Sequence, residues 1–276
     1  MSPSLIEIAE DAGAYRQTTT GDVRLAMDDV VLLHRPTSDT FEFHEATRLR
    51  LPGDPQKRIH EIRAWFRSQG CTKWLWALGP SSTPANLERH LRAGHDLKMV
   101  DEAGHHALLM DHEPPPGPDG VDIREVRTFE AFCRLDEVQS IAFDEPASIR
   151  AEMASSRSAR WDALRESGDV ALLAYLDGVP VAGAMMAPLQ DGAWFLLGGA
   201  TIPEARGRGL YRALVHGRWT TVAEHGGVAM VTHAGSMSTP ILRSLGFVDA
   251  GRVDLLLERV EAGPLADRDW LDRESR

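Results

Sequence analysis

The sequence predicts an α/β (α+β) protein made of two similar domains, each a mixed, mostly antiparallel sheet flanked by helices. Three observations support this fold class. Strand-like and helix-like segments alternate through the second half, several of their landmarks return in the first half, and four prolines mark residues 113–120 as a connecting segment. We therefore expect domains over residues 1–113 and 121–276, with a proline-rich linker over 114–120.

The second half carries the clearer pattern of the two. Asp177-Gly178 joins two apolar segments as a hairpin turn, and Thr239 and Gly246 mark the ends of a short helix. The predicted strands are 121–126, 169–176, 179–188, 194–202, 228–232 and 253–260, and the predicted helices are 129–165, 209–225 and 239–246. The first of these helices is broken at residues 144–146, where a proline interrupts the pattern.

The first half repeats these landmarks at an offset of 156 residues. The matching positions are Arg50 with Arg206, Gly53 with Gly209, Gly70 with Gly226, Gly79 with Gly235 and Thr83-Pro84 with Thr239-Pro240. Residues 54–69 have helical spacing, 72–78 form an apolar strand-like run, and 83–93 form a capped helix. We interpret the first half as a second copy of the fold.

Composition limits the possible partners. The 276 residues include 41 acidic and 30 basic side chains, for a formal net charge of −11, which disfavours a nucleic-acid-binding role. No apolar run approaches the ~20 residues of a membrane span, and the start lacks a signal-peptide pattern. We expect a cytoplasmic monomer or homodimer that binds a small molecule and neither nucleic acid nor membrane.

The sequence offers no recognisable metal site. Cys71 and Cys133 lie far apart and outside any CxxC motif, so they are interpreted as core thiols. His105, His106 and His112 lack the spacing of metal ligands. No metal is therefore expected.

The densest chemical signal lies in residues 201–214, TIPEARGRGLYRAL. A strand ends, a loop with two glycines follows, and a helix begins at once. This order directs backbone N–H groups and the positive end of a helix dipole at one point, which favours a pyrophosphate. A dinucleotide loop would need glycine at Arg212, and the Gly-Lys-Ser/Thr of a Walker loop is missing.

This segment resembles the acetyl-CoA loop of the GNAT superfamily of N-acetyltransferases, whose pattern is Arg/Gln-x-x-Gly-x-Gly/Ala. Arg206 and Gly209 match the pattern, whereas Tyr211 stands where the family has a small residue. The resemblance covers roughly residues 121–260 in the order of elements and extends more weakly to the first half as a tandem copy. The equivalent loop there, 50–55, contains two prolines and Asp54, so we expect that copy to be degenerate and unable to bind the cofactor.

The resemblance implies acetyl-CoA as donor substrate, with pantetheine along the splayed end of the strand 194–202. The implied cofactor-binding residues are Ala200, Thr201, Arg206, Gly207, Arg208, Gly209, Leu210, Tyr211 and Ser238. The family's usual catalytic groups are missing, because strand 194–202 carries no carboxylate and Leu242 replaces the usual tyrosine. Because the carboxylate and the tyrosine are both missing, the resemblance does not identify the groups that transfer protons.

Candidate bases are His233, whose ordinary pKa would suit the task, and Glu145 beside Asp144 on the expected acceptor wall. Each of these residues also has a purely structural interpretation. Ser236 and Ser238 could offer a proton near the sulfur, and a water chain would need none of these groups. His233 and Glu145 are therefore the predicted catalytic residues.

The predicted function is transfer of an acetyl group from acetyl-CoA to the primary amine of a small metabolite by direct attack. The negative charge favours a cationic acceptor. Two alternatives stay open: a CoA-binding protein without catalysis, and an acyltransferase that uses a longer acyl-CoA.

Overall fold

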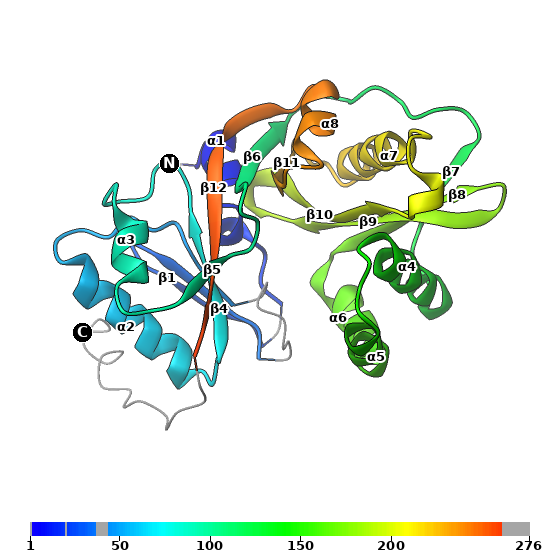
Figure 1. Ribbon diagram of the computed structural model, residues 1–276. Coiled ribbons are helices and arrows are strands. Elements are labelled where there is room, and N and C mark those ends of the chain that lie inside the picture. Colours follow the sequence, from blue (N-terminus) through cyan, green and yellow to red (C-terminus); the bar gives the residue numbers. More distant parts are fainter. Residues whose placement is uncertain (1, 20, 37–43, 261–276) are drawn as a thin grey trace. The chain divides into compact units, whose positions relative to one another are not determined.

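The computed structural model describes residues 2–19, 21–36 and 44–260 (Figure 1). The chain forms two compact units. Within the described residues, the C-terminal unit contains 2–5, 108–232 and 240–249, and the N-terminal unit contains 6–107, 233–239 and 250–260. The predicted borders at 113 and 121 therefore differ from the observed division, which assigns 108–120 to the C-terminal unit and returns two later segments to the N-terminal one.

The C-terminal unit is built on a sheet with strand order β11-β10-β9-β8-β7. Its strands are β7 (Val121–Glu125), β8 (Val170–Leu176), β9 (Val179–Pro188), β10 (Ala193–Thr201) and β11 (Ala229–Ala234). Among the described strands of this unit, β10 and β11 pair parallel and the other neighbours pair antiparallel, as expected for a mixed, mostly antiparallel sheet. The predicted turn joins β8 to β9, with positive φ at both Asp177 and Gly178.

Helices cover both faces of this sheet (Figure 1). They are α4 (Phe129–Ala142), α5 (Ala147–Ser155), α6 (Arg157–Ser167), α7 (Leu210–Glu224) and α8 (Thr239–Ser244), with the short 3-10 turns η3 (Gln190–Gly192) and η4 (Pro203–Ala205). On one face, Leu210 and Leu214 of α7 pack with Leu172 of β8. On the other, Phe132 and Leu135 of α4 pack with Leu173. The alternation of residues along β8 thus supplies both cores.

The N-terminal unit has its own sheet, with strand order β1-β2-β3-β4-β12 and with β5 also paired to β12. Its strands are β1 (Val23–Ala26), β2 (Val31–His34), β3 (His44–Thr47), β4 (Lys73–Leu78), β5 (Leu97–Met99) and β12 (Val248–Arg259), and β6 (His105–Met110) begins in this unit. Its helices are α1 (Leu5–Glu10), α2 (Pro55–Ser68) and α3 (Leu87–Arg92), with the turn η1 (Ala12–Tyr15). Trp65 and Phe66 of α2 pack with Trp74 and Trp76 of β4 in the core.

The last strand, β12, completes the N-terminal sheet. Its residues Asp254–Arg259 pair antiparallel with Leu78–Lys73 of β4. Leu256 is fully buried there, and the Glu258 carboxylate accepts hydrogen bonds from Trp76 Nε1 at 2.8 Å and Arg63 Nε at 2.8 Å. The segment predicted to close the second domain is therefore held in the first unit by apolar burial and a buried ion pair.

The internal repeat has a structural counterpart. Moving α2 and β4 forward by 156 positions gives 211–224 and 229–234, which overlie α7 and β11 in sequence. The correspondence ends at the next element, because α3 begins at Leu87 rather than near Thr83. Thr83 instead donates its N–H to Leu49 O at 3.0 Å and accepts from Leu51 N–H at 3.0 Å, so its backbone is used in a bridge and not in a helix.

Two smaller predictions concern the cysteines and the membrane. Cys71 is buried and Cys133 half-buried, and both are free thiols. In the described parts of the chain, every helix is too short or too polar to cross a membrane.

Candidate functional site

The start of α7 presents backbone donors without a side-chain cap. Its N-cap is Gly209, in the left-handed conformation with φ of 77°, and the first helical hydrogen bond runs from Ala213 N–H to Gly209 O at 3.0 Å. The N–H groups of Leu210, Tyr211 and Arg212 precede that bond, so helix geometry gives them no acceptor within the helix. Arg208 and Arg212 are exposed beside them. The loop therefore leads into an uncapped helix start, and its use as an anion site stays a prediction.

Strand β10 diverges from β11 just before this loop. Its ladder with β11 ends at Phe195 and Val231, and Thr232 Oγ1 donates to Leu196 O at 3.1 Å beyond that point. The ladder with β9 on the other side continues to Thr201, with a bulge between Leu197 and Ala200. The second half of β10 thus turns one backbone edge away from β11, as a splayed strand does, and it contains two of the predicted cofactor residues, Ala200 and Thr201.

Tyr211, which departs from the family pattern, turns its ring inward beneath β10. A Cβ atom built on Gly199 would lie 2.9 Å from Tyr211 Cε2. Gly199 therefore makes room for the ring, which explains how a large residue fits where the family pattern has a small one. The Tyr211 N–H keeps its place in the first turn of α7.

Arg218 is a buried cation in the same place, and sequence reasoning missed it. Its side chain lies on α7 with 1% exposure, donates from Nε to Leu214 O at 3.3 Å, and lies 5.9 Å from the Tyr211 ring centroid. Within the described residues, the Nη2 atom is buried without a hydrogen-bond partner. Burial lowers the pKa of this guanidinium from its ordinary value, with Tyr211 opposing the shift. Arginine stays charged even so, which leaves a desolvated donor beside Gly199.

Arg206 holds the loop in position through its side chain. Nη2 donates to Ala142 O at the end of α4 at 2.9 Å, and Nε donates to Thr201 O at 3.2 Å. Its backbone N–H is also used, in the 3-10 turn η4, with Pro203 O as acceptor. Arg206 is thus a positioning residue that ties the loop to β10 and α4. This contact also brings the loop to the turn between α4 and α5, where Glu145 lies half-buried.

The segment predicted as a linker packs against α7. A Cβ atom on Gly209 would lie 2.9 Å from Pro118 Cγ, and one on Gly117 would lie 2.5 Å from Ala213 Cβ. His216 Nε2 lies 3.2 Å from Glu113 Oε1. The proline-rich segment is therefore part of the surface around the anion loop, and Gly209 is required both by its φ angle and by this close approach.

The corresponding loop of the N-terminal unit is closed by its own side chains. Asp54 caps α2 by accepting from Gln56 N–H at 3.0 Å, and Pro55 occupies the first helical position. Arg50, at the position of Arg206, donates from Nη2 to Asp11 Oδ2 at 2.7 Å. A carboxylate of the chain itself, that of Asp54, thus caps the start of α2, whereas the start of α7 has no side-chain cap.

His233, predicted as a catalytic base, lies in the N-terminal unit with its ring donating to a backbone carbonyl. Nε2 lies 2.9 Å from Ala9 O, and a carbonyl can only accept, so Nε2 carries the proton. The surrounding protein lowers the pKa of His233 to about 4, although the residue keeps partial exposure. The expectation that His233 keeps its ordinary pKa is therefore wrong, because it ignores desolvation.

The structure divides the predicted site residues between the two units. Ala200, Thr201, the loop 206–211 and Glu145 lie in the C-terminal unit, whereas His233 and Ser238 lie in the N-terminal one. Ser238 Oγ donates to Gly235 O at 3.3 Å, and Ser236 N–H donates to Asp101 Oδ2 at 3.4 Å. Leu242 is buried, so α8 offers no hydroxyl at the position of the family's tyrosine.

Comparison with solved structures identifies the fold. A GCN5-related N-acetyltransferase from Kribbella flavida is 19% identical, with a TM-score of 0.65 over 92% of this chain and 95% of that chain. A tandem GNAT protein from the clavulanic acid biosynthesis pathway is 16% identical, with a TM-score of 0.57 over 96% and 90%. A GCN5-related N-acetyltransferase from Sphaerobacter thermophilus is 16% identical, with a TM-score of 0.54 over 85% and 82%.

Neither a protein-family model nor a curated protein matches the sequence. The structural likeness extends over both units, and it confirms the predicted fold class: the chain has the fold of the GNAT acetyltransferases, including that of a tandem protein.

Proposed function

We propose that the chain is an acyl-CoA-dependent N-acyltransferase whose single donor site lies in the C-terminal unit, with acetyl-CoA as donor. The observation that carries the proposal is the uncapped start of α7 beside the splayed half of β10. Backbone N–H groups at a helix start bind phosphate, and an unpaired strand edge binds the amides of an extended chain such as pantetheine. The GNAT fold, found by comparison, supports this use of the two features.

Different residues would bind the different parts of the donor. The N–H groups of Leu210, Tyr211 and Arg212 bind the pyrophosphate, with Arg208 and Arg212 adding positive charge. The backbone of Ala200 and Thr201 binds the pantetheine arm and polarises the thioester carbonyl. Arg206 fixes the loop to β10 and to the end of α4 through its two hydrogen bonds to backbone carbonyls.

We infer that Arg218 also serves the donor. A buried guanidinium without an anionic partner costs stability, so its retention needs a compensating role. Its unpartnered Nη2 lies beside Gly199 on the splayed strand, where it could donate to a carbonyl of the acyl-CoA.

The reaction would be direct attack of an acceptor amine on the thioester carbonyl. The new C–N bond forms as the C–S bond breaks, the thiolate leaves with the electron pair, and the ammonium proton goes to a base. Burial lowers the pKa of His233 to about 4, so a rate that depended on this imidazole as the base would not change between pH 5 and 8. Glu145 stays the alternative base, beside the contact between Arg206 and Ala142.

The acceptor we propose is the primary amine of a small cationic metabolite, because the chain carries a net charge of −11. The second candidate function is binding of CoA without catalysis. Two observations favour it: Leu242 is buried where the family has a tyrosine, and His233 is a weak base.

One screen separates the two functions. Amine libraries are incubated with the full chain and acetyl-CoA, and released thiol is measured, with Gly209→Val as the variant that lacks the donor site. The enzyme hypothesis expects at least one amine that accelerates thiol release with the wild type alone. Saturable acetyl-CoA binding without any amine-dependent release would favour the binding protein. Repeating the screen with longer acyl-CoA thioesters identifies the donor.

A further inference from the structure

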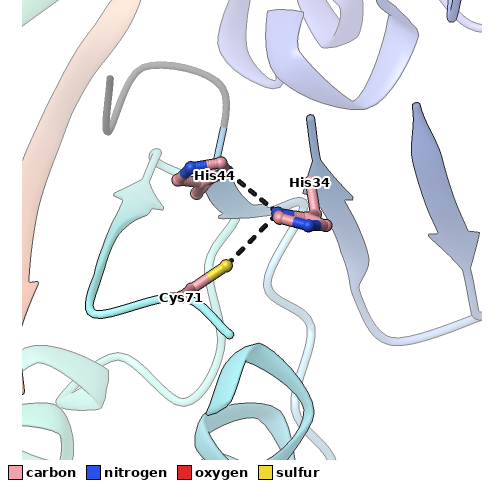
Figure 2. A group of neighbouring side chains, drawn as sticks. All are labelled: His34, His44 and Cys71. Carbon is pink, nitrogen blue, oxygen red and sulfur yellow. Dashed lines mark hydrogen bonds between the residues drawn. The ribbon is translucent and has the colours of Figure 1, made fainter. Parts of the chain in front are cut away.

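A cluster of three metal-ligand side chains lies in the N-terminal unit, separate from the donor site. His34 ends β2, His44 begins β3, and Cys71 lies just before β4 (Figure 2). Their exposed fractions are 7%, 5% and 7%. The two imidazoles and the thiol each offer one ligand atom, and these atoms all lie within 4.8 Å of one another.

The backbone fixes this convergence. His34 and His44 are directly opposite each other in the antiparallel ladder of β2 and β3, so their side chains leave the same face of the sheet. Strand β4 runs parallel to β3, which brings the segment before it, with Cys71, to the same end. The cluster is not recognisable in the sequence, because its members are 10 and 27 positions apart and follow no metal-binding motif.

Hydrogen bonds within the cluster do not fully satisfy the His34 Nδ1 atom. His34 Nδ1 lies 3.1 Å from His44 Nδ1 and 3.2 Å from Cys71 Sγ. An imidazole nitrogen carries either one lone pair or one proton, so His34 Nδ1 can form one well-matched hydrogen bond of the two. A cation between the three atoms would accept a lone pair from each of them at once.

The distances suit a small cation with nitrogen and sulfur ligands. Tetrahedral zinc has Zn–N near 2.0–2.1 Å and Zn–S near 2.3 Å, so its ligand atoms lie roughly 3.3–3.6 Å apart. The separations from His34 Nδ1 to the other two atoms are a few tenths of an ångström shorter, and the third separation is within 4.8 Å, so small side-chain rotations would bring the three atoms to these distances. Mg²⁺ and Ca²⁺ prefer oxygen ligands, and none of the three side chains supplies one.

The protonation states of the cluster are compatible with a cation. Burial and the neighbouring His44 lower the pKa of His34 to about 4, so its imidazole is neutral and has a lone pair at neutral pH. Burial raises the pKa of the Cys71 thiol to about 11, a shift that a bound cation reverses because it stabilises the thiolate.

We propose that His34, His44 and Cys71 form a binding site for Zn²⁺, with three protein ligands and a fourth position for water. The bound ion ties the hairpin formed by β2 and β3 to the start of β4. The cluster lies in the N-terminal unit and the loop 206–211 in the C-terminal unit, and the proposal does not rest on the acyltransferase function.

The test uses the full chain, freed of metal by a chelator and then titrated with Zn²⁺ against a chromophoric zinc indicator. We expect one Zn²⁺ per chain. Cys71→Ser and His34→Gln should each weaken binding by more than the roughly 10–100-fold typical of losing an outer-shell partner. Cys133→Ser is the matched control, since it removes the other cysteine, on α4, and should leave Zn²⁺ affinity unchanged.

Co²⁺ gives a second readout, because its spectrum reports directly whether a thiolate is a ligand. The wild type and Cys133→Ser should show a thiolate-to-cobalt charge-transfer band with tetrahedral ligand-field bands, and Cys71→Ser should lack the charge-transfer band. Zn²⁺ should raise the Tm of the first two proteins and not of the third. A wild type that binds no Zn²⁺, or a Cys71→Ser variant that binds Zn²⁺ as the wild type does, would overturn the proposal and leave a hydrogen-bonded core cluster.

Discussion

Helices α2 and α7 occupy matching places in the two halves of the chain, and their starts differ in what they offer an anion. Asp54 caps α2 and Pro55 lacks an N–H, whereas Gly209 at the start of α7 has no side chain to cap the helix. Arg50 is neutralised by Asp11, whereas the equivalent Arg206 binds backbone carbonyls. The start of α2 thus has a side-chain cap, and the start of α7 has none.

The buried sides of α2 and α7 also differ, since one carries an apolar residue where the other carries a cation. Ile62 of α2 is 1% exposed in the apolar core of the N-terminal unit, and 156 positions later Arg218 of α7 is 1% exposed with an unpartnered Nη2, considering the described residues. At this position the N-terminal unit gains stability from apolar packing, whereas the C-terminal unit buries a cation and loses part of that stability. We propose that the two copies of the fold have specialised, the N-terminal one for stability and the C-terminal one for binding.

The largest expected effect comes from the two helix-start glycines. Gly209→Val should weaken acetyl-CoA binding roughly 100-fold, because valine is strained at positive φ and its Cβ meets Pro118. Gly53→Val, with a φ of 68° and open space around it, should leave the Kd unchanged. Titration calorimetry on both variants measures the difference. Equal losses would contradict the contrast between the two loops.

Arg218→Leu gives α7 the apolar interior of α2. We expect acetyl-CoA binding to weaken roughly 10–100-fold, the range for losing a hydrogen bond to a charged group. The free energy of unfolding should stay the same or rise, because an apolar residue replaces a buried cation without a carboxylate partner. Denaturant unfolding and calorimetry report the two effects separately. A less stable variant with unchanged affinity would make Arg218 a structural residue.

The matched arginines should show opposite phenotypes. Arg206→Ala should weaken acetyl-CoA binding roughly 5- to 10-fold through loss of two carbonyl contacts, with little change in stability. Arg50→Ala should lower the free energy of unfolding by about 2 kcal/mol, because Asp11 is left buried without its cation, and should not change the Kd. An Arg50 variant that lost affinity would give the N-terminal loop a role in binding.

The smallest effect concerns a buried acid of the N-terminal unit. Burial raises the pKa of Glu45 to about 7, so the folded chain binds its proton more tightly than the unfolded chain does. The stability from this group is complete below the ordinary value near 4.5 and is lost as the pH rises through about 7. Glu45→Gln should remove that loss, so its stability relative to wild type should rise by about 1 kcal/mol between pH 5 and 8. Urea unfolding across this range gives the comparison, and parallel curves would contradict it.

Local patterns predicted much of the fold and the donor loop. The helix-start glycines, the Asp177-Gly178 turn and the alternation in β8 and β9 are local signals, and each lies in the element that it predicts. Contacts between distant segments were not predictable in this way. The pairing of β12 with β4, the burial of Arg218 beneath Gly199 and the convergence of His34, His44 and Cys71 depend on register between strands and on packing.

The expected pKa of His233 was wrong for a related reason. A histidine at a strand end has an ordinary pKa in the sequence, and only the three-dimensional structure shows the Ala9 carbonyl and the surrounding protein that lower it to about 4. Residue type suggests a function, and desolvation decides whether the group can perform it.

We propose that the chain has one donor site, at the start of α7, and that the matching site at α2 is closed. Calorimetric titration of the wild-type full chain with acetyl-CoA tests this most directly. We expect a single binding event with one molecule of acetyl-CoA per chain, which disappears in Gly209→Val. Two equivalent sites, or no binding by the wild type, would contradict it.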